Sequence, residues 1–356
     1  MAILGLGLIG GSIGLAARRR AGAQVRGYDP DEGVRAKALA LGAIDAPAAD
    51  IAGAVAGAQA VFVAAPVAAL PETVRLALDD SAPDCVVTDV GSTKRLLAGL
   101  ASEDRRFVGG HPLAGAETSG VEHAREDLFD GATWYLTPDQ GTAGSLYERL
   151  HRLLVSFGAR PTAVDPDTHD RLMACVSHLP HVLANLLASQ AASLLADEPA
   201  PRLPAVGPSF RDATRVAGAN SAIWTDIYLS NSDALIAGID QLSARLGEVR
   251  SVLERGDAGA VRAWNEHARS DREALLGAGL AGGPVHEIRA SVPNRPGVVA
   301  EIALALGRAG VNIVDMALSP SEDNRQGSVA LWIGGGEESR RALELIADLG
   351  FPVASA

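Results

Sequence analysis

The stretch "AILGLGLIGGSIGLAARRRAG", residues 2–22, decides the fold. A short apolar segment runs into glycines spaced as GxGxxG, and a helical pattern follows. In such a motif the first glycine permits a tight turn, the second lets the backbone approach a pyrophosphate, and the third allows close packing of helix on strand. The free N–H groups at the start of the helix then face the phosphates. The residues expected at this dinucleotide site are Gly5, Gly7, Leu8, Ile9 and Gly10.

An acidic residue follows the glycine turn at the distance that a dinucleotide site requires. The next expected strand, residues 25–29 ("VRGYD"), ends on Asp29, which lies 19 positions after Gly10. A carboxylate there bonds the adenosine ribose hydroxyls of NAD and repels the 2′-phosphate of NADP. The three residues after it, "PDE", supply no arginine to receive that phosphate. The sequence therefore favours NAD as the cofactor.

Residues 1–158 alternate apolar strand candidates with helical stretches. The strand candidates are residues 2–7, 25–29, 60–66, 85–92, 106–112 and 133–138. Such alternation predicts an α/β domain of the Rossmann type, with a parallel sheet flanked by helices. A dinucleotide lies at the carboxyl edge of such a sheet. We therefore also expect Ala64, Ala65 and Pro66, which end the third candidate, beside the cofactor.

Two further domains are expected after residue 158. A prior of about 150 residues per domain suggests two or three domains in a chain of 356 residues. Residues 159–282 carry apolar residues at helical spacing, which predicts an all-helical domain. The stretch "GAGLAGGP", residues 277–284, indicates a linker. Residues 285–356 then follow a βαββαβ pattern, which predicts a small ferredoxin-like α+β domain.

The composition limits the classes of partner. The formal net charge is −12, which gives no electrostatic case for binding nucleic acid or an anionic membrane. The two cysteines, Cys85 and Cys175, form no CxxC pair and suit a reducing compartment. No signal peptide is visible, and no apolar run approaches the roughly 20 residues of a membrane span. We expect a cytoplasmic protein with neither a nucleic-acid nor a membrane partner.

One histidine stands out among the eight in the chain. His111 lies in "VGGHPLAGAETSG" (residues 108–120), at the sheet edge where the cofactor should lie. A nicotinamide enzyme that oxidises an alcohol needs a base for the hydroxyl proton, and histidine suits this task near neutral pH. We expect Gly109 and Gly110 to leave room there for substrate and nicotinamide. Ser92, in "TDVGSTK", ends another strand and could orient the imidazole; a helix N-cap is the alternative.

The helical segment holds a second histidine motif. In "VSHLPH", His178 and His181 lie three positions apart, with His169 and Cys175 nearby. Such a group allows a zinc interpretation. We expect no metal, because no further ligand pair has metal-site spacing and a hydride-transfer enzyme of this design needs none.

Two arginines follow in "SFRDATRVAGANSAIWTDI". Arg211 and Arg215 lie four positions apart, on one face of a helix, near Trp224. The spacing is typical of a solvated helix surface. The functional alternative is a guanidinium fork that binds a substrate carboxylate.

Taken together, these motifs resemble the prephenate dehydrogenase family, including its arogenate-using relatives. The matching stretches are "GLGLIGGSIG", "VTDVGSTK", "FVGGHPLAGAETSGVE", "VSHLPHVLA" and "FRDATRVA" followed by "IWTDI", in this order across residues 3–228. The resemblance implies oxidation of prephenate with NAD, in which loss of the ring carboxylate as carbon dioxide yields 4-hydroxyphenylpyruvate for tyrosine biosynthesis. It also implies that the helical domain forms a homodimer.

The resemblance also implies roles for individual residues. His111 would be the base that takes the hydroxyl proton, and Ser92 would bond near the same hydroxyl. Arg215 would hold a substrate carboxylate. The residues implied to shape the substrate pocket are His178, His181, Glu117 and Trp224.

The last segment is similar to an ACT domain, a fold that often binds an amino acid at a strand-helix turn. The matching stretch is "VPNRPGVVAEIALALGRAGVNI", residues 292–313. The resemblance implies a regulatory site for an aromatic amino acid, with tyrosine as the first candidate effector. The residues expected at this site are Asn294, Arg295, Gly297 and Asn312.

Three alternatives compete with this interpretation. An arogenate dehydrogenase would give tyrosine directly from a substrate that differs only in its side chain. A β-hydroxyacid dehydrogenase would need a lysine on a helix after the nucleotide domain, whereas no lysine follows Lys94. A non-catalytic sensor of NAD and amino acids would not need His111, Ser92 and Arg215 together.

Overall fold

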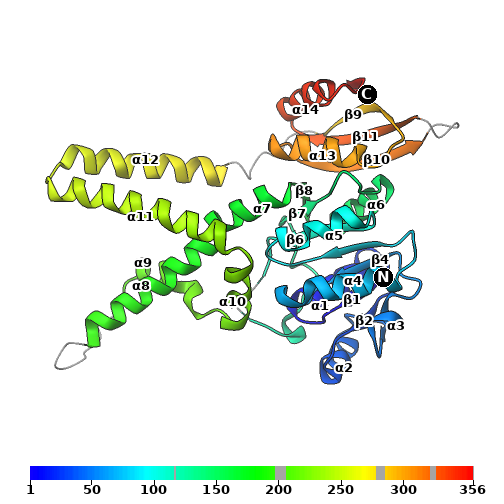
Figure 1. The fold of residues 1–356 in the computed structure, drawn as a ribbon, viewed down its shortest axis with the longest axis horizontal. Coiled ribbons are helices and arrows are strands. Elements are labelled where there is room, and N and C mark those ends of the chain that lie inside the picture. Colours follow the sequence, from blue (N-terminus) through cyan, green and yellow to red (C-terminus); the bar gives the residue numbers. More distant parts are fainter. Residues whose placement is uncertain (116–117, 197–205, 278–284, 321–325, 356) are drawn as a thin grey trace. The chain divides into compact units, whose positions relative to one another are not determined.

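The chain folds into two compact units. The computed structural model describes residues 1–115, 118–196, 206–277, 285–320 and 326–355 (Figure 1). The first unit combines Met1–His169 with Gly283–Ala356, and the second comprises Asp170–Gly282. The linker expected at residues 277–284 lies outside the described residues apart from Gly277.

An eight-stranded sheet forms the centre of the first unit (Figure 1). Its strands are β1 (Ala2–Leu4), β2 (Arg26–Tyr28), β3 (Ala46–Pro47), β4 (Ala60–Val63), β5 (Val86–Asp89), β6 (Phe107–Pro112), β7 (Thr133–Thr137) and β8 (Arg160–Ala163). Their spatial order is β3-β2-β1-β4-β5-β6-β7-β8. Neighbouring strands run parallel, except that β6 and β7 are antiparallel. The order reverses between β1 and β4, and this switch point is where doubly wound folds bind dinucleotides.

Helices and short 3-10 turns connect the strands. The helices are α1 (Leu8–Arg19), α2 (Glu32–Ala40), α3 (Ile51–Val55), α4 (Leu70–Asp80), α5 (Ala98–Glu103) and α6 (Gly144–Ser156). Alternate residues of the central strands enter two different apolar clusters. Ile3 and Phe62 belong to one cluster, and Leu4 and Val63 belong to the other. Burial on both faces explains why these strands are continuously apolar in the sequence.

The expected α/β architecture is confirmed, and two strands are added to it. β3 has only two residues and ends on Pro47, and β8 is the segment "RPTA", so neither carries an apolar run. Because β8 pairs with β7, the sheet continues into the segment that we expected to be all-helical. The antiparallel direction of β7 was also not expected, since an apolar pattern does not specify strand direction.

The C-terminal residues form a four-stranded antiparallel sheet with two helices. The elements are β9 (Val285–Pro293), α13 (Val298–Arg308), β10 (Ile313–Pro320), β11 (Gln326–Gly334), α14 (Gly336–Asp348) and β12 (Val353–Ser355). The strand order is β10-β11-β9-β12, and the expected βαββαβ order is confirmed. α13 and β10 pack against α6 and β8. The backbones approach closely at Gly307, where a Cβ would lie 1.8 Å from the carbonyl oxygen of Ala163.

The second unit is helical throughout its described residues, as expected. α7 (Pro166–Met173) carries the boundary between the units and continues through a π-helical turn, Ala174–His178, into α8 (Leu179–Ala196). The remaining elements are α9 (Pro208–Thr214), the 3-10 turn η5 (Arg215–Gly218), α10 (Ser221–Ser230), α11 (Ser232–Glu254) and α12 (Ala258–Gly277). In Figure 1, α11 and α12 form an antiparallel pair.

One helical stretch in the described residues is long and apolar enough to cross a membrane. It spans Pro166–Leu194, with a mean hydropathy of 1.3. We expected no such segment, because polar residues interrupt the apolar residues of this stretch in the sequence. The stretch qualifies only because the structure joins it into one continuous helix. The core helix of a globular helical domain passes the same test of length and composition.

Candidate active site

The glycine turn between β1 and α1 has the geometry of a phosphate-binding loop. Gly5 has a φ of +94°, and a Cβ there would lie 2.4 Å from the carbonyl oxygen of Ala64. A Cβ on Gly10 would lie 1.9 Å from the Gly5 carbonyl oxygen, so the backbone requires both glycines. A Cβ on Gly7 would meet no atom within 4 Å. This open space at the N-terminus of α1 fits the pyrophosphate of a dinucleotide.

The other residues expected beside the cofactor surround this turn. The N–H of Ala64 donates to the last carbonyl oxygen of β1 at 2.6 Å, which places the end of β4 beside the end of β1. Ala65 and Pro66 continue from this contact, and Leu8 and Ile9 form the first turn of α1. Their contact with a cofactor stays a prediction.

Asp29 is tied to the same turn. Its carboxylate accepts hydrogen bonds from the backbone N–H groups of Leu6 at 2.9 Å and Asp31 at 3.0 Å. Arg35 of α2 donates to the carbonyl oxygen of Asp29. This arginine was not predicted, because it lies beyond the three residues that follow Asp29. Residues three or four positions apart lie on the same face of a helix, so Arg35 of α2 comes back close to the start of this helix. This spacing is the signal by which Arg35 could have been predicted.

The two glycines before His111 have a role that we did not expect. A Cβ on Gly109 would lie 2.3 Å from Oγ1 of Thr137. A Cβ on Gly110 would lie 2.6 Å from the carbonyl oxygen of Asp89 and 3.1 Å from Nε1 of Trp134. These glycines therefore let β6 pack tightly between β5 and β7. The expectation that they leave room for substrate and nicotinamide was wrong, because neighbouring strands fill that space.

A buried ion pair joins the loop after β5 to the end of β6. Asp89 and Lys94 form this pair with fully buried side chains. Lys94 Nζ also donates to the carbonyl oxygen of Gly110 at 2.6 Å, and Asp89 accepts from the N–H groups of Gly110 at 3.0 Å and Gly91 at 2.8 Å. Ser92 lies between Gly91 and Lys94, so the pair fixes its loop against β6. This role of Lys94 was not predicted, although Lys94 is one of only two lysines in the chain.

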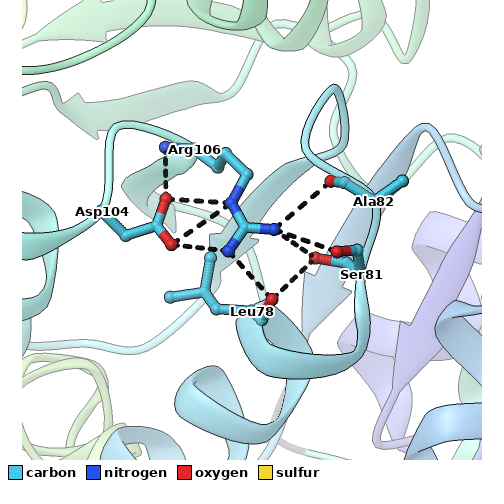
Figure 2. Close-up of polar contacts among 5 residues, drawn as sticks. All are labelled: Leu78, Ser81, Ala82, Asp104 and Arg106. Atoms are coloured by element: carbon cyan, nitrogen blue, oxygen red, sulfur yellow. Dashed lines mark hydrogen bonds and ion pairs between the residues drawn. The ribbon is translucent and has the colours of Figure 1, made fainter.

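Arg106 anchors the other end of β6 (Figure 2). Its guanidinium donates to the carbonyl oxygens of Leu78 at 2.9 Å and Ser81 at 3.0 Å, where α4 ends. It also donates to the carboxylate of Asp104 at 2.6 Å, and this hydrogen bond lowers the pKa of Asp104. These contacts fix the start of β6 against α4. They thereby orient the strand whose other end carries His111.

A second histidine contacts His111 directly. His111 is half-buried on β6, opposite Tyr135 of β7. Its Nδ1 lies 2.9 Å from Nε2 of His169, a fully buried side chain on α7. This contact was not predicted, because 58 positions separate the two histidines and no local motif links them. With Nδ1 engaged by His169, a substrate proton would be received at Nε2.

Within the helical unit, three of the expected pocket residues form one aromatic cluster. The rings of His181 and Trp224 stack with centroids 3.6 Å apart and planes inclined by 2°. The ring of His178 meets the same indole edge-on at 6.2 Å. Nδ1 of His181 also contacts the hydroxyl of Tyr228. The structure therefore brings the two motifs "VSHLPH" and "IWTDI" together.

Other contacts tie this cluster to the segment of Arg215. Burial lowers the pKa of His181, and a backbone interaction with Val216 partly offsets this effect. Val216 follows Arg215, an exposed residue at the start of η5. His178 is buried, and its Nδ1 lies 3.2 Å from the side-chain amide of Asn231. These contacts fix the histidine motif against both η5 and the start of α11.

Two further expectations concern Glu117 and metals. Glu117 lies outside the described residues, so its place at the substrate pocket stays a prediction. In the described part of the chain, no group of three or more His, Cys, Asp or Glu side chains could hold a metal ion.

The glycine turn at the switch point and the histidine at the carboxyl edge of the same sheet define a nicotinamide-dependent dehydrogenase. Three family models match the chain in order. They are "Prephenate dehydrogenase, nucleotide-binding domain" at residues 13–163, "Prephenate dehydrogenase, dimerization domain" at 165–266 and "ACT domain" at 286–350. The chain belongs to the prephenate dehydrogenase family, and it is an NAD-dependent oxidoreductase with a dimerisation domain and an ACT domain.

Individual relatives agree with this assignment. The chain is 32% identical to prephenate dehydrogenase of Bacillus subtilis, over 97% of this chain and 94% of that protein. The structure of prephenate dehydrogenase from Aquifex aeolicus, solved with hydroxyphenyl propionate and NAD+, matches with a TM-score of 0.72 at 29% identity, over 77% of this chain and 97% of that one. Synechocystis arogenate dehydrogenase matches with a TM-score of 0.68 at 27% identity, over 77% and 99%.

Proposed function

We propose that this protein oxidises prephenate with NAD to give 4-hydroxyphenylpyruvate and carbon dioxide, and that arogenate is the weaker substrate. The observation that carries the proposal is the place of His111. It lies at the end of β6, at the same carboxyl edge as the glycine turn, with Nδ1 engaged by His169. Relatives from Bacillus subtilis and Lactococcus lactis that match over 97% of this chain are named prephenate dehydrogenase, which supports the choice of substrate.

The proposed chemistry begins with a proton transfer to His111. Its Nε2 takes the hydroxyl proton of prephenate, and Ser92, on the loop fixed by Asp89 and Lys94, bonds the same oxygen. NAD, when bound at the glycine turn, supplies the hydride acceptor. The ring carbon becomes a ketone, and the C–C bond to the ring carboxylate then breaks, with its electron pair passing through the ring to the ketone oxygen. His111 can return the proton to the resulting phenolate, and aromatisation makes the sequence effectively irreversible.

The proposed binding residues are charged or aromatic. Arg215 binds a substrate carboxylate through its guanidinium, and Glu117 lies at the mouth of the pocket. His178, His181 and Trp224, which form the aromatic cluster described above, shape the pocket around the substrate ring. Asp29 favours NAD over NADP, because a 2′-phosphate would meet its carboxylate.

A comparison of substrates tests the proposed function. Purified protein should form NADH from NAD and prephenate, and kcat/KM should be higher for prephenate than for arogenate and higher with NAD than with NADP. A preference for arogenate would reverse the substrate assignment. If neither substrate gave NADH, the enzyme hypothesis would fail and a sensor of NAD and amino acids would be favoured.

We also propose that the chain acts as a homodimer in the cytoplasm. Its helical unit exposes many apolar side chains that a second copy would cover. They include Leu186, Leu187, Leu194, Leu229, Ile236, Leu246 and Leu253, of which Leu229 is 72% exposed. In this proposal residues 1–158 bind the cofactor, residues 159–282 dimerise and bind the substrate, and residues 285–356 regulate the activity.

For regulation, we propose that an aromatic amino acid, tyrosine first, binds beside the turn between β9 and α13. A cavity of about 440 Å³ lies there, between the ACT sheet and the nucleotide-binding domain. Asn294 and Arg295 line it together with Arg105, which precedes β6. Gly297 brings the turn close, since a Cβ there would lie 1.9 Å from the carbonyl oxygen of Gln140. Asn312, also expected at this site, is not among the described residues that line the cavity.

The cavity predicts which residues an effector needs. Its walls include Val298, Val299 and Leu318, which suit an aromatic ring, and Arg105 supplies a cation for the carboxylate. Calorimetry on the full chain should show tyrosine binding, and Arg105→Gln should weaken it by about 10-fold or more, the loss of one charge-assisted bond. Arg289→Gln, which removes an exposed partner of Glu287 outside the cavity, is the matched control. If neither tyrosine nor phenylalanine gave a heat of binding, the effector assignment would be contradicted.

A further inference from the structure

His169 is a buried, ionisable side chain that contacts the proposed base but does not itself exchange a proton with the substrate in the proposed mechanism. Its exposure is 0%. Its ring packs edge-on against Tyr135 of β7, with centroids 5.5 Å apart, and against His111 of β6, at 5.1 Å. Most buried polar side-chain atoms in proteins have at least one hydrogen-bond partner. The partner that the fold provides at Nε2 is the imidazole of His111.

The local structure holds His169 firmly. The side chain of Asp165 accepts from the N–H of Thr168 at 2.9 Å, and its carbonyl oxygen accepts from the N–H of His169 at 2.9 Å. Asp165 thus caps the first turn of α7. Arg308 of α13 lies 3.4 Å from the same carboxylate, so the ACT domain also supports this turn. The position of His169 is therefore set by β8, α7 and α13 together.

We propose that His169 is a positioning residue that fixes the tautomer of His111. A neutral imidazole carries one proton, on either Nδ1 or Nε2. When Nε2 of His169 accepts a hydrogen bond, His111 must carry its proton on Nδ1 and present the lone pair of Nε2 to the substrate. The same bond orients the imidazolium that forms when Nε2 takes the substrate proton. This inference rests on the proposed role of His111 as the base.

Two variants of His169 separate hydrogen bonding from packing. His169→Leu fills the space but offers no hydrogen-bond acceptor. We expect kcat to fall roughly 10²-fold. Loss of a charged partner of a catalytic histidine costs more, about 10⁴-fold. His169→Gln keeps an acceptor oxygen and should stay within about 5-fold of wild type, with KM for prephenate nearly unchanged in both variants. His151→Leu removes another buried histidine, on α6, and should leave kcat unchanged.

Two readouts test the mechanism itself. In a His111→Asn background, His169→Leu should cost no further rate, because His169 acts only through His111. Nitrogen-15 NMR of the wild-type ring, assigned by the signal that His111→Asn removes, should show the His111 proton on Nδ1. A proton on Nε2 instead, or a His169→Leu variant with kcat within about 3-fold of wild type, would overturn the inference. The inference would also be overturned if His169→Leu and His169→Gln both folded and lost kcat to the same extent. A His111→Asn variant of normal activity would instead refute the proposed base, while the NMR result would still decide the tautomer.

Discussion

The His111→Asn variant should lose about 10²- to 10⁴-fold in kcat, while KM for prephenate changes little. Asparagine keeps a polar side chain of smaller size at the end of β6, but it cannot accept a proton near neutral pH. The strand itself should stay intact, because Arg106 anchors its start and Lys94 bonds the carbonyl oxygen of Gly110. Initial rates of NADH formation at saturating NAD measure the effect.

Arg215→Ala provides the contrast that makes this result specific. It should raise KM for prephenate by about 10- to 150-fold, corresponding to the roughly 1.5–3 kcal/mol of a hydrogen bond to a charged group, with a smaller effect on kcat. The two variants therefore divide the kinetic loss between chemistry and binding. A His111→Asn variant with near wild-type kcat would remove His111 from the role of base, and a flat KM for Arg215→Ala would remove the carboxylate assignment.

Most of the fold could be predicted because its determinants are local. The GxGxxG spacing, the apolar runs of β1, β4, β5 and β6, and the βαββαβ pattern of the ACT domain each lie within a few consecutive residues. Short or polar strands such as β3 and β8 were not predicted, because they are recognised only by their pairing with a neighbouring strand. The direction of β7 also depends on how the chain returns to the sheet, which no local pattern records.

The candidate site divides in the same way. His111 and Ser92 could be proposed because each lies at the end of an apolar strand candidate. His169 could not, because its meaning comes from a contact across 58 positions. The glycines before His111 were misinterpreted for a related reason. A glycine signals that space is needed, but the sequence does not say whether a ligand or a neighbouring strand needs it.

The Asp89→Asn variant should destabilise the nucleotide-binding domain by about 3–5 kcal/mol. Both members of the pair with Lys94 are fully buried, so the substitution removes a buried carboxylate charge to which the ammonium group of Lys94 donates. Asparagine can still accept one of the two backbone hydrogen bonds that the carboxylate receives from Gly91 and Gly110. Native-state hydrogen exchange of the β5 and β6 amides measures the change in the free energy of unfolding where the pair acts.

Two comparisons decide whether buried charge is the cause. Glu254→Gln breaks the Arg250–Glu254 pair, whose side chains are 79% and 59% exposed, and should cost at most about 0.5 kcal/mol. Adding Lys94→Met to Asp89→Asn also removes the buried positive charge and should recover more than half of the loss. If the double variant were less stable than Asp89→Asn alone, the hydrogen bond from Lys94 to Gly110, and not the ion pair, would be the main support of the strand end that carries His111.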